Sequence, residues 1–496
     1  MPSASQYNIP PEAVKLIPNS NQASPGSYSI VKKFAYLFSA YWFREILQGI
    51  LLIYLARNFA ITFGQFILAI NIGQIMLFVA EFGLNQHLAT LLARKTNYPT
   101  AILLQVSLVK SLLLSLSWLG MLIFIFWQNY DSDLKWLIVI LATGVALDAL
   151  ASSFFVTCQV LGRQDVESRL QSLGAFLGFG YGITTLLLGF HPLTISAYKL
   201  IETCTSLSGV AIILLRRVRR GTVSVGWRDF KLIWMTWRGS ITYTLMAIAA
   251  ILYNKINIFF LQKFAGSNGV ANYSVTWQVV DGISIMISGM LLRKILFPLL
   301  IKLWIANREE FSRLVRNTAS WLFTVAVFFT FILYIESDRI ILLVFGDKYC
   351  NAVWMQKYLA GTILFAFLHN LAHYIMISIQ RERLLLIFYL LGLAFNMTTC
   401  AILIPGNPLL GSVVSILATK IFVAAMTVLF CQLTLHIIPL YSFLQIIAAM
   451  GLCASLYYLG TTYVLREIGE ILALLPIGTL AWCWRKRLTV LTNRSM

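Results

Sequence analysis

Residues 55–75 read LARNFAITFGQFILAINIGQI, and the apolar run that begins here holds no charged side chain between Arg57 and Glu81. A helix needs about 20 mostly apolar residues to cross the hydrocarbon core of a bilayer. The whole chain has the same character, since 59% of its 496 residues are hydrophobic, 11% are charged, and the mean hydropathy is +0.79. Soluble domains have about 25% charged residues, so this chain could not cover a soluble surface. We therefore predict an all-α integral membrane protein.

Fourteen apolar runs are long enough to form transmembrane helices. They lie at 34–56, 66–84, 101–127, 135–161, 171–190, 194–215, 232–262, 271–298, 318–336, 352–379, 384–404, 409–432, 438–463 and 468–484. The loops between them are short, which leaves no room for a soluble catalytic domain on either face. We therefore expect the function to lie among the helices, and we do not expect an enzyme.

The basic residues indicate which loops face the cytoplasm. The chain has 38 Lys and Arg against 19 Asp and Glu, a net charge of +19. If both termini are cytoplasmic, most of these cations fall in cytoplasmic loops, including RRVRR at 216–220 and RKR at 485–487, as the positive-inside rule requires. Topology and contact with anionic lipid then explain the charge excess, and we expect no nucleic-acid partner.

An internal repeat divides the chain. LARNFAITFGQFILAINIGQI from Leu55 parallels LQKFAGSNGVANYSVTWQVVDGI from Leu261, because each has a cation two residues after the Leu, a loop with small residues, and an aromatic residue that opens the next span. Parallel repeats are typical of transporters whose substrate site lies between two halves. We predict a disordered cytoplasmic tail without a cleaved signal peptide at 1–30, a six-span N-lobe at 31–215, a basic cytoplasmic linker at 216–231, a six-span C-lobe at 232–432, and two further spans with a basic cytoplasmic tail at 433–496.

The residues that most often bind metals show no suitable pattern. The seven cysteines have neither metal-ligand nor redox spacing. His369 and His373 lie four residues apart on one face of a predicted helix, but no further ligands accompany them. We expect no metal and no cofactor, and the spacing of the two histidines favours polar packing or cavity lining.

Several segments show a family resemblance. They are YLARNFAITFGQFILAINIGQIMLFVAEFGLNQHLATLLAR at 54–94, FLQKFAGSNGVANYSV at 260–275, FPLL at 297–300 with NREEFSRL at 307–314, VFGDKYCNAV at 344–353, and NMTTCAILIPGNPLLGSVVSILATK at 396–420. In this order they resemble segments of the polysaccharide/O-antigen flippases, a branch of the multidrug/oligosaccharidyl-lipid/polysaccharide exporter superfamily. The resemblance covers about residues 34–440.

That resemblance implies a V-shaped bundle of about 14 transmembrane helices, with two six-helix lobes and two C-terminal helices, that alternates between inward-open and outward-open states. It implies an undecaprenyl-diphosphate-linked oligosaccharide as cargo, moved from the inner to the outer leaflet of the bacterial cytoplasmic membrane. Membrane lipids, a polysaccharide polymerase and export machinery are the implied partners. Asn257 departs from the family, because many relatives have an acidic residue there, and this puts any role of that carboxylate in doubt.

Charged residues deep in the predicted spans form the candidate site. A charge at the bilayer centre costs at least ~2.5–3.5 kcal/mol on insertion scales, so it is retained where it faces a cavity, a partner or the interface. The deepest cations by helical rise are Arg44, Lys110 and Lys420. Within a cavity between the lobes they would compensate the charge of a diphosphate. The alternative is internal pairing, for example of Arg44 with Asp148 or of Lys420 with Asp281.

Further charged residues extend this set. Arg238 and Lys255 lie near the inner and outer ends of the span 232–262, where each is either the rim of a basic cavity or an interfacial anchor. Lys199 and Glu202, three residues apart on one helical face, predict a structural pair. The carboxylates that could act as counter-ions, or bind H⁺ or Na⁺ and couple transport to a gradient, are Asp148, Asp281 and Glu45.

These features bear on three candidate functions. A flippase for lipid-linked oligosaccharide fits the two-lobe plan, the cations in the spans and the ordered segments. A cation-coupled multidrug exporter of the same superfamily should have a more acidic cavity. A membrane-embedded polysaccharide polymerase would need a sizeable loop with catalytic carboxylates or a metal motif, and the sequence has none.

Overall fold

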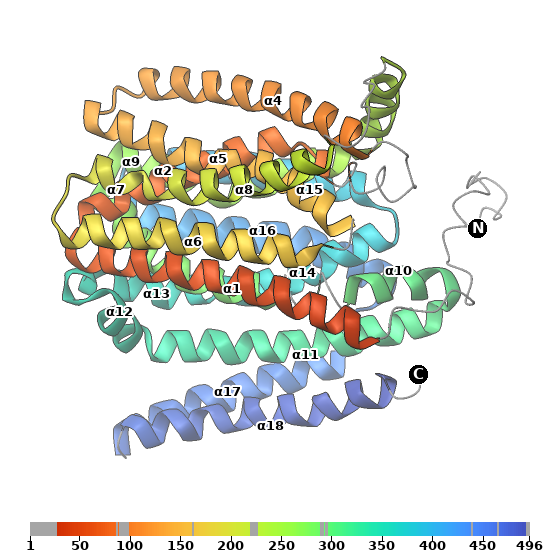
Figure 1. Ribbon diagram of the computed structural model, residues 1–496. Helices are drawn as coiled ribbons and strands as arrows, with labels where there is room; N and C mark the ends of the chain where they lie inside the picture. The colour runs from red at the N-terminus through yellow and green to blue at the C-terminus, as the bar shows by residue number, and fades with distance from the viewer. Residues whose placement is uncertain are drawn as a thin grey trace.

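The computed structural model shows a bundle of α-helices that lie side by side (Figure 1). It describes residues 27–85, 88, 99–160, 163–218, 227–287, 292, 296–437, 440–463 and 466–492. Most of the predicted tail at 1–30 and the centre of the predicted linker at 216–231 lie outside these residues. The first group of helices is α1 (Ser27–Asn58), α2 (Ala60–Glu81), α4 (Pro99–Trp127), α5 (Ser132–Val160), α6 (Gln164–Leu187), α7 (Pro192–Ser196) and α8 (Tyr198–Val218).

The second group follows the predicted linker. It comprises α9 (Trp227–Ile287), α10 (Phe297–Ala306), α11 (Arg308–Ile335), α12 (Ser337–Phe345), the 3₁₀ helix η4 (Asp347–Ala352), α13 (Val353–Ala360), α14 (Thr362–Ser378), α15 (Glu382–Leu403) and α16 (Pro408–Leu435). The chain ends with α17 (Leu440–Tyr463) and α18 (Arg466–Thr492), which pack against each other and lie beside α11 at one edge of the bundle (Figure 1).

The helices account for the predicted spans. Ten of the described helices are long and apolar enough to cross a membrane, and the bent pair 347–360 and 362–378 makes an eleventh. Two predicted spans share α9, while α1 and α18 coincide with the first and last predicted spans. Helices dominate because every backbone N–H and C=O in hydrocarbon must be bonded within the segment itself. The predicted all-α, multi-pass membrane fold is confirmed.

The long helix α9 contains a reversal at Gly266. This residue has φ 63° and ψ −170°, outside the helical region, and the positive φ is one that glycine adopts without a steric cost. Asn257 donates a hydrogen bond of 2.6 Å to the hydroxyl of Tyr273. Sixteen residues of straight helix would separate these two by about 24 Å, so the chain must turn back between them. α9 is therefore a helical hairpin that supplies two spans.

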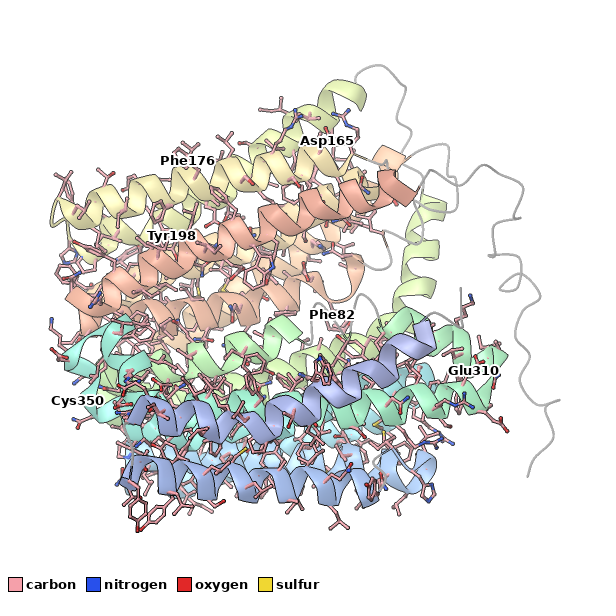
Figure 2. All side chains as sticks on the ribbon, turned by 90° about the horizontal axis from the view of Figure 1, so that it is seen from below. Phe82, Asp165, Phe176, Tyr198, Glu310 and Cys350 are labelled. Carbon is pink, nitrogen blue, oxygen red and sulfur yellow. The ribbon has the colours of Figure 1, made fainter. Side chains whose placement is uncertain are left out.

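Two lobes diverge towards one end of the molecule. Figure 2 shows the helices from α1 to α8 as one group and those from α9 onward as another, close together near Cys350 and further apart near Glu310. The charge pattern predicts that the end where α1 begins and α18 ends is cytoplasmic, and we call it the predicted cytoplasmic end. The opposite end, which includes Cys350, is the predicted external end.

Contacts between the lobes gather at the predicted external end. The Tyr349 hydroxyl donates to the carbonyl of Ala56 at 3.1 Å, and the Lys348 ammonium donates to the carbonyl of Asn58 at 3.3 Å. Nearby, α2 packs closely on α9 at Gly64, where a Cβ atom would clash with the carbonyl oxygen of Ser267. The external closure thus depends on a backbone approach that only glycine permits.

A methyl group at Gly64 should loosen this closure. We expect Gly64→Ala to separate α2 from α9, because no rotamer can move a Cβ away from a backbone oxygen. The measurement is the rate at which Ala271→Cys, fully buried at this contact, reacts with a membrane-impermeant maleimide in a background without native cysteines. Labelling should be several-fold faster than with Gly120→Ala, whose Cβ has no neighbour within 4 Å. Equal rates in the two variants would contradict a closure built on Gly64.

The C-terminal hairpin α17–α18 is attached to the C-lobe in two ways. Apolar side chains form one cluster across α11, α17 and α18, which includes Phe323, Cys453 and Ile477. At the predicted external end, Arg466 of α18 forms a bidentate pair with Asp338 of α12, with both bonds at 2.8 Å. This pair holds the pKa of Asp338 down at about 2.

The ionic attachment should therefore weaken in acid. A carboxylate with a lowered pKa stabilises the folded state above its unfolded pKa, near 4, and loses that contribution as the pH falls towards 2. We expect Asp338→Asn to lower the thermal unfolding temperature at pH 6, with most of the difference from wild type lost at about pH 2. The exposed Asp347→Asn at the same end serves as the control. A difference for Asp338→Asn that is unchanged between the two pH values would exclude this role.

Candidate functional site

The N-lobe holds a network of charges at mid-depth. Arg44 of α1 forms ion pairs with Asp148 of α5 and with Glu202 of α8, the latter at 2.6 Å from its Nε. The Lys199 ammonium donates to both oxygens of Glu202 at 2.9 Å, which is the pair expected from their spacing. Glu45, exposed beside Arg44, interacts electrostatically with this network. Two cations thus meet three carboxylates, and the contacts join three helices.

A cavity of about 260 Å³ leads from this network towards the predicted cytoplasmic end. Arg44 and Asp148 line its deep part, while Glu81 at the end of α2 and Glu167 in the first turn of α6 line the other. Ser152, Gln159 and Gln171 add polar groups. Three carboxylates against one guanidinium make this cavity of the N-lobe acidic.

Lys110 lies inside the N-lobe and does not line the cavity. Its side chain is fully buried, and its ammonium donates to Asn85 at 2.6 Å, to the carbonyl of Ala149 at 2.8 Å and to Ser152 at 3.3 Å. An ammonium has three donors, and all three are used. In this conformation no donor of Lys110 remains for a cargo.

The C-lobe holds a second charged cluster, formed by α9 and α16. The Lys420 ammonium lies 5.6 Å from the ring centres of both Tyr253 and Trp277, within the range of cation–π attraction. It interacts electrostatically with Asp281 and Lys255. These three charged side chains are half-buried, and their sum is positive. The cluster therefore combines an excess cation with aromatic faces.

Arg238 and Lys255 mark the two ends of the predicted span 232–262, and the structure describes the side chain of Lys255. Lys255 lies 11 residues before Gly266, about 16 Å along the helix, and its electrostatic partner is Asp281. It therefore belongs to the mid-depth C-lobe cluster and is not an anchor at the external interface. The side chain of Arg238 lies outside the described part of the structure.

Residues 30–304, more than half of the chain, match the sequence family described as "Polysaccharide biosynthesis protein". The chain belongs to this family. The match confirms the resemblance found in the sequence. No curated protein sequence matches the chain.

Solved structures share the fold of this polysaccharide biosynthesis family member. The lipid II flippase MurJ in an inward closed conformation is similar with a TM-score of 0.69 and 12% identity, over 91% of this chain and 98% of that one. An inward-facing multidrug resistance MATE transporter of the MOP superfamily gives 0.63 and 14%, over 79% and 94%. A MOP superfamily transporter from Pyrococcus furiosus, described by a binding pocket of reverse polarity, gives 0.53 and 14%, over 82% and 94%. At these identities the likeness shows the exporter fold alone.

Asn257, where the family resemblance implies an acidic residue, lies in the first arm of the α9 hairpin. It is fully buried, and its amide donates to Tyr273. A carboxylate here could only accept that hydrogen bond, so the amide changes the polarity of the contact. In this family member, position 257 joins two helical halves and bears no charge.

The sequence alone does not distinguish several residues of these clusters. Glu81 and Glu167 lie near helix ends, where hydropathy alone suggests interfacial positions. Tyr253 is one aromatic residue among many, and only the partners of Lys420 distinguish it. Among the described residues, no group of His, Cys, Asp and Glu is arranged to hold a metal ion.

Removal of the Arg44 side chain should destabilise the N-lobe. Breaking a buried ion pair costs about 3–5 kcal/mol. Because the side chains of Arg44 and Asp148 retain 22% and 20% exposure, we expect Arg44→Ala to lower the free energy of unfolding by an amount near the lower end of that range. The measurement is denaturant unfolding in detergent micelles, with the exposed Arg57→Ala on the same helix as control. The double variant Arg44→Ala/Asp148→Asn should recover part of the loss, and strictly additive effects would contradict the pairing.

Proposed function

We propose that the chain is a flippase that moves an undecaprenyl-diphosphate-linked oligosaccharide from the inner to the outer leaflet of a bacterial cytoplasmic membrane by alternating access. Membership of a polysaccharide biosynthesis family and the exporter fold support a lipid-linked glycan as the cargo. Both termini are then cytoplasmic, as the charge bias favours. A polysaccharide polymerase and export machinery are the proposed partners downstream.

The observation that best supports this proposal is the C-lobe cluster. A diphosphate needs cationic donors, and a sugar ring packs well on an aromatic face. Lys420 and Lys255 exceed the charge of Asp281, and Lys420 lies over Tyr253 and Trp277. The buried indole N–H of Trp277 has no hydrogen-bond partner among the described residues. A phosphate or hydroxyl oxygen of the cargo would satisfy that donor.

The arrangement of the lobes fits loading from the cytoplasmic side. Their contacts lie at the predicted external end, at Tyr349 with Ala56 and at Gly64. The lobes diverge towards the other end (Figure 2). A cargo made at the cytoplasmic leaflet would enter from that end, and release would require the Gly64 contact to open.

A second candidate is a cation-coupled small-molecule exporter of the same superfamily. The observation that favours it is the acidic cavity of the N-lobe, with Glu81, Asp148 and Glu167 against Arg44. Such a cavity attracts cations. In the flippase it would instead hold a coupling H⁺ or Na⁺, so the transported substrate distinguishes the two functions.

The test is transport by the full-length protein in proteoliposomes. We expect inward-to-outward movement of a fluorescent undecaprenyl-diphosphate oligosaccharide, which Lys420→Gln lowers at least about tenfold, since one charge-assisted bond contributes about 1.5–3 kcal/mol. Lys420→Arg should retain most of the rate because it keeps the charge. Lys135→Gln, which removes a cation at the predicted external end, is the control and should transport at the wild-type rate.

A parallel assay with a cationic dye separates the two candidates. Dye efflux without lipid movement would contradict the flippase function and support the small-molecule exporter. If Lys420→Gln moves the lipid at the wild-type rate, the protein is a flippase but the C-lobe cluster is not part of its binding site.

A further inference from the structure

The turn between α10 and α11 places a group of cations at the predicted cytoplasmic end of the C-lobe. They are Lys302 on α10 and Arg308, Arg313 and Arg316 on α11. Glu310, in the same turn, lies at the end where the two lobes are further apart (Figure 2). Within the part of the chain that the structure describes, none of these four cationic side chains forms an ion pair or a hydrogen bond. The proposed transport site uses none of them.

A helix cap fixes the backbone of this turn. Asn307 has extended backbone angles, φ −153° and ψ 104°, which end α10. Its side-chain oxygen accepts hydrogen bonds from the N–H groups of Glu309 and Glu310 at 3.1 and 3.2 Å, the usual role of asparagine before the first turn of a helix. The rings of Trp304 and Phe311 meet across the turn, with 5.1 Å between their centres. The residue after the cap, Arg308, therefore starts from a defined position.

An aromatic ring, and not a carboxylate, holds the side chain of Arg308. The guanidinium carbon lies 3.0 Å from the centre of the Trp304 ring, within the range of cation–π attraction. This contact uses the face of the guanidinium, whereas its five N–H donors lie around its edge. Because Arg308 has no hydrogen bond within the described structure, these donors are available. A guanidinium that is already oriented loses less entropy on binding, and its fork matches two oxygens of a phosphate.

The cations at the opposite end of the C-lobe have protein partners. Arg466, for example, forms its bidentate pair with Asp338. At the α10–α11 turn the carboxylates of Glu309 and Glu310 are adjacent in sequence, yet neither pairs with a cation in the described structure. The cations of the turn also outnumber these two carboxylates. The turn therefore has a positive excess that the protein itself does not neutralise.

The length of α11 places these cations at the level of lipid headgroups. α11 has 28 residues and is about 40 Å long, about 10 Å more than the hydrocarbon core of a bilayer. Its last residue, Ile335, accepts a hydrogen bond from Arg466 at the predicted external end. If the hydrocarbon begins there, it ends roughly 20 residues further in, close to Arg316. Arg313 and Arg308 then lie about 3 and about 10 Å outside it, a range that spans the headgroup layer.

The exposed face of α10 favours a lipid over a soluble anion. Ile301 and Ile305 lie one helical turn apart and are 40% and 82% exposed. Lys302, also exposed, lies beside Ile301. Apolar and basic side chains that are exposed together are typical of helices in the interface of a membrane. The apolar side chains would contact the body of a lipid while the cations contact its phosphate.

We propose that the α10–α11 turn binds the phosphate headgroup of an anionic phospholipid in the leaflet at the predicted cytoplasmic end. The edge of the Arg308 guanidinium binds two phosphate oxygens while Trp304 supports its face. Lys302 and Arg313 add positive charge beside this contact, as basic residues near an anionic membrane surface do. The site is separate from the C-lobe cluster, so it does not depend on the proposed cargo.

The test is native mass spectrometry of the full-length protein with phosphatidylglycerol as the probe and phosphatidylcholine, which has no net charge, as the comparison. We expect Arg308→Gln to weaken the tightest binding of phosphatidylglycerol at least about tenfold, since it removes a charge-assisted hydrogen bond, and to leave phosphatidylcholine unchanged. Trp304→Leu should weaken phosphatidylglycerol binding less, because it removes only the support of the guanidinium. Arg383→Gln, which removes an exposed cation in the first turn of α15, is the control and should bind like wild type.

Competition identifies the source of the phosphate. Inorganic phosphate that displaces phosphatidylglycerol would show a site for a soluble anion and contradict the lipid site. An undecaprenyl-diphosphate lipid that binds more tightly than phosphatidylglycerol, and loses this advantage in Arg308→Gln, would replace the phospholipid by the cargo. Equal effects of Arg308→Gln and Arg383→Gln would also overturn the site. Because the measurement is lipid binding without transport, none of these results contradicts the flippase, and failure of transport would not contradict the lipid site.

Discussion

A charge placed in hydrocarbon needs a partner, and the N-lobe is organised around that need. Arg44 lies between Asp148 and Glu202, and Glu202 also accepts from Lys199. The two contacts of Arg44 join α1 to α5 and to α8, so these helices cannot separate without exposing an unpaired charge in a medium of low dielectric constant. Lys110 repeats the pattern with neutral partners, since Asn85, Ala149 and Ser152 absorb its three donors. The cations of this lobe hold helices together.

The charges of the C-lobe are balanced differently from those of the N-lobe, and this difference suggests that the two lobes bind different ions. Lys420 and Lys255 share one carboxylate, Asp281, so one positive charge remains without a counter-charge in the cluster. Tyr253 and Trp277 soften that excess by cation–π attraction, which an anion can add to without first breaking an ion pair. The N-lobe offers the opposite, a cavity with more carboxylates than cations. An anionic group and a small cation would therefore bind on different lobes.

Hydropathy predicted the helices well because the membrane leaves the backbone few alternatives. It also predicted depth, so the mid-depth charges were found. Hydropathy could not predict which surroundings a side chain points into. Lys110 and Lys420 are both deep lysines in the sequence. In the structure, all three donors of Lys110 are used inside the N-lobe, whereas Lys420 is half-buried beside aromatic rings. The apolar run places Lys255 near the outer end of the span 232–262, as either the rim of a cavity or an interfacial anchor, whereas in the structure it belongs to the mid-depth cluster. The first half of α9 runs from Trp227 to the reversal at Gly266, longer than a bilayer requires, and so distance from its inner part overestimates depth.

Helix α9 carries both the external contact with α2 and part of the charged cluster of the C-lobe. Its hairpin contributes Ser267 and Ala271 to the external contact with α2. About eleven to fifteen residues from the reversal at Gly266, its two arms contribute Tyr253, Lys255 and Asp281 to the charged cluster. Because both arms are joined through Asn257 and Tyr273, we expect a rotation that breaks the Gly64 contact to move Tyr253, Lys255 and Asp281 together. A ligand bound at Lys420 of α16 would also contact Tyr253 and Trp277, which belong to the helix that closes the external end. Cargo binding and gate opening can be coupled through α9 without a longer path between them.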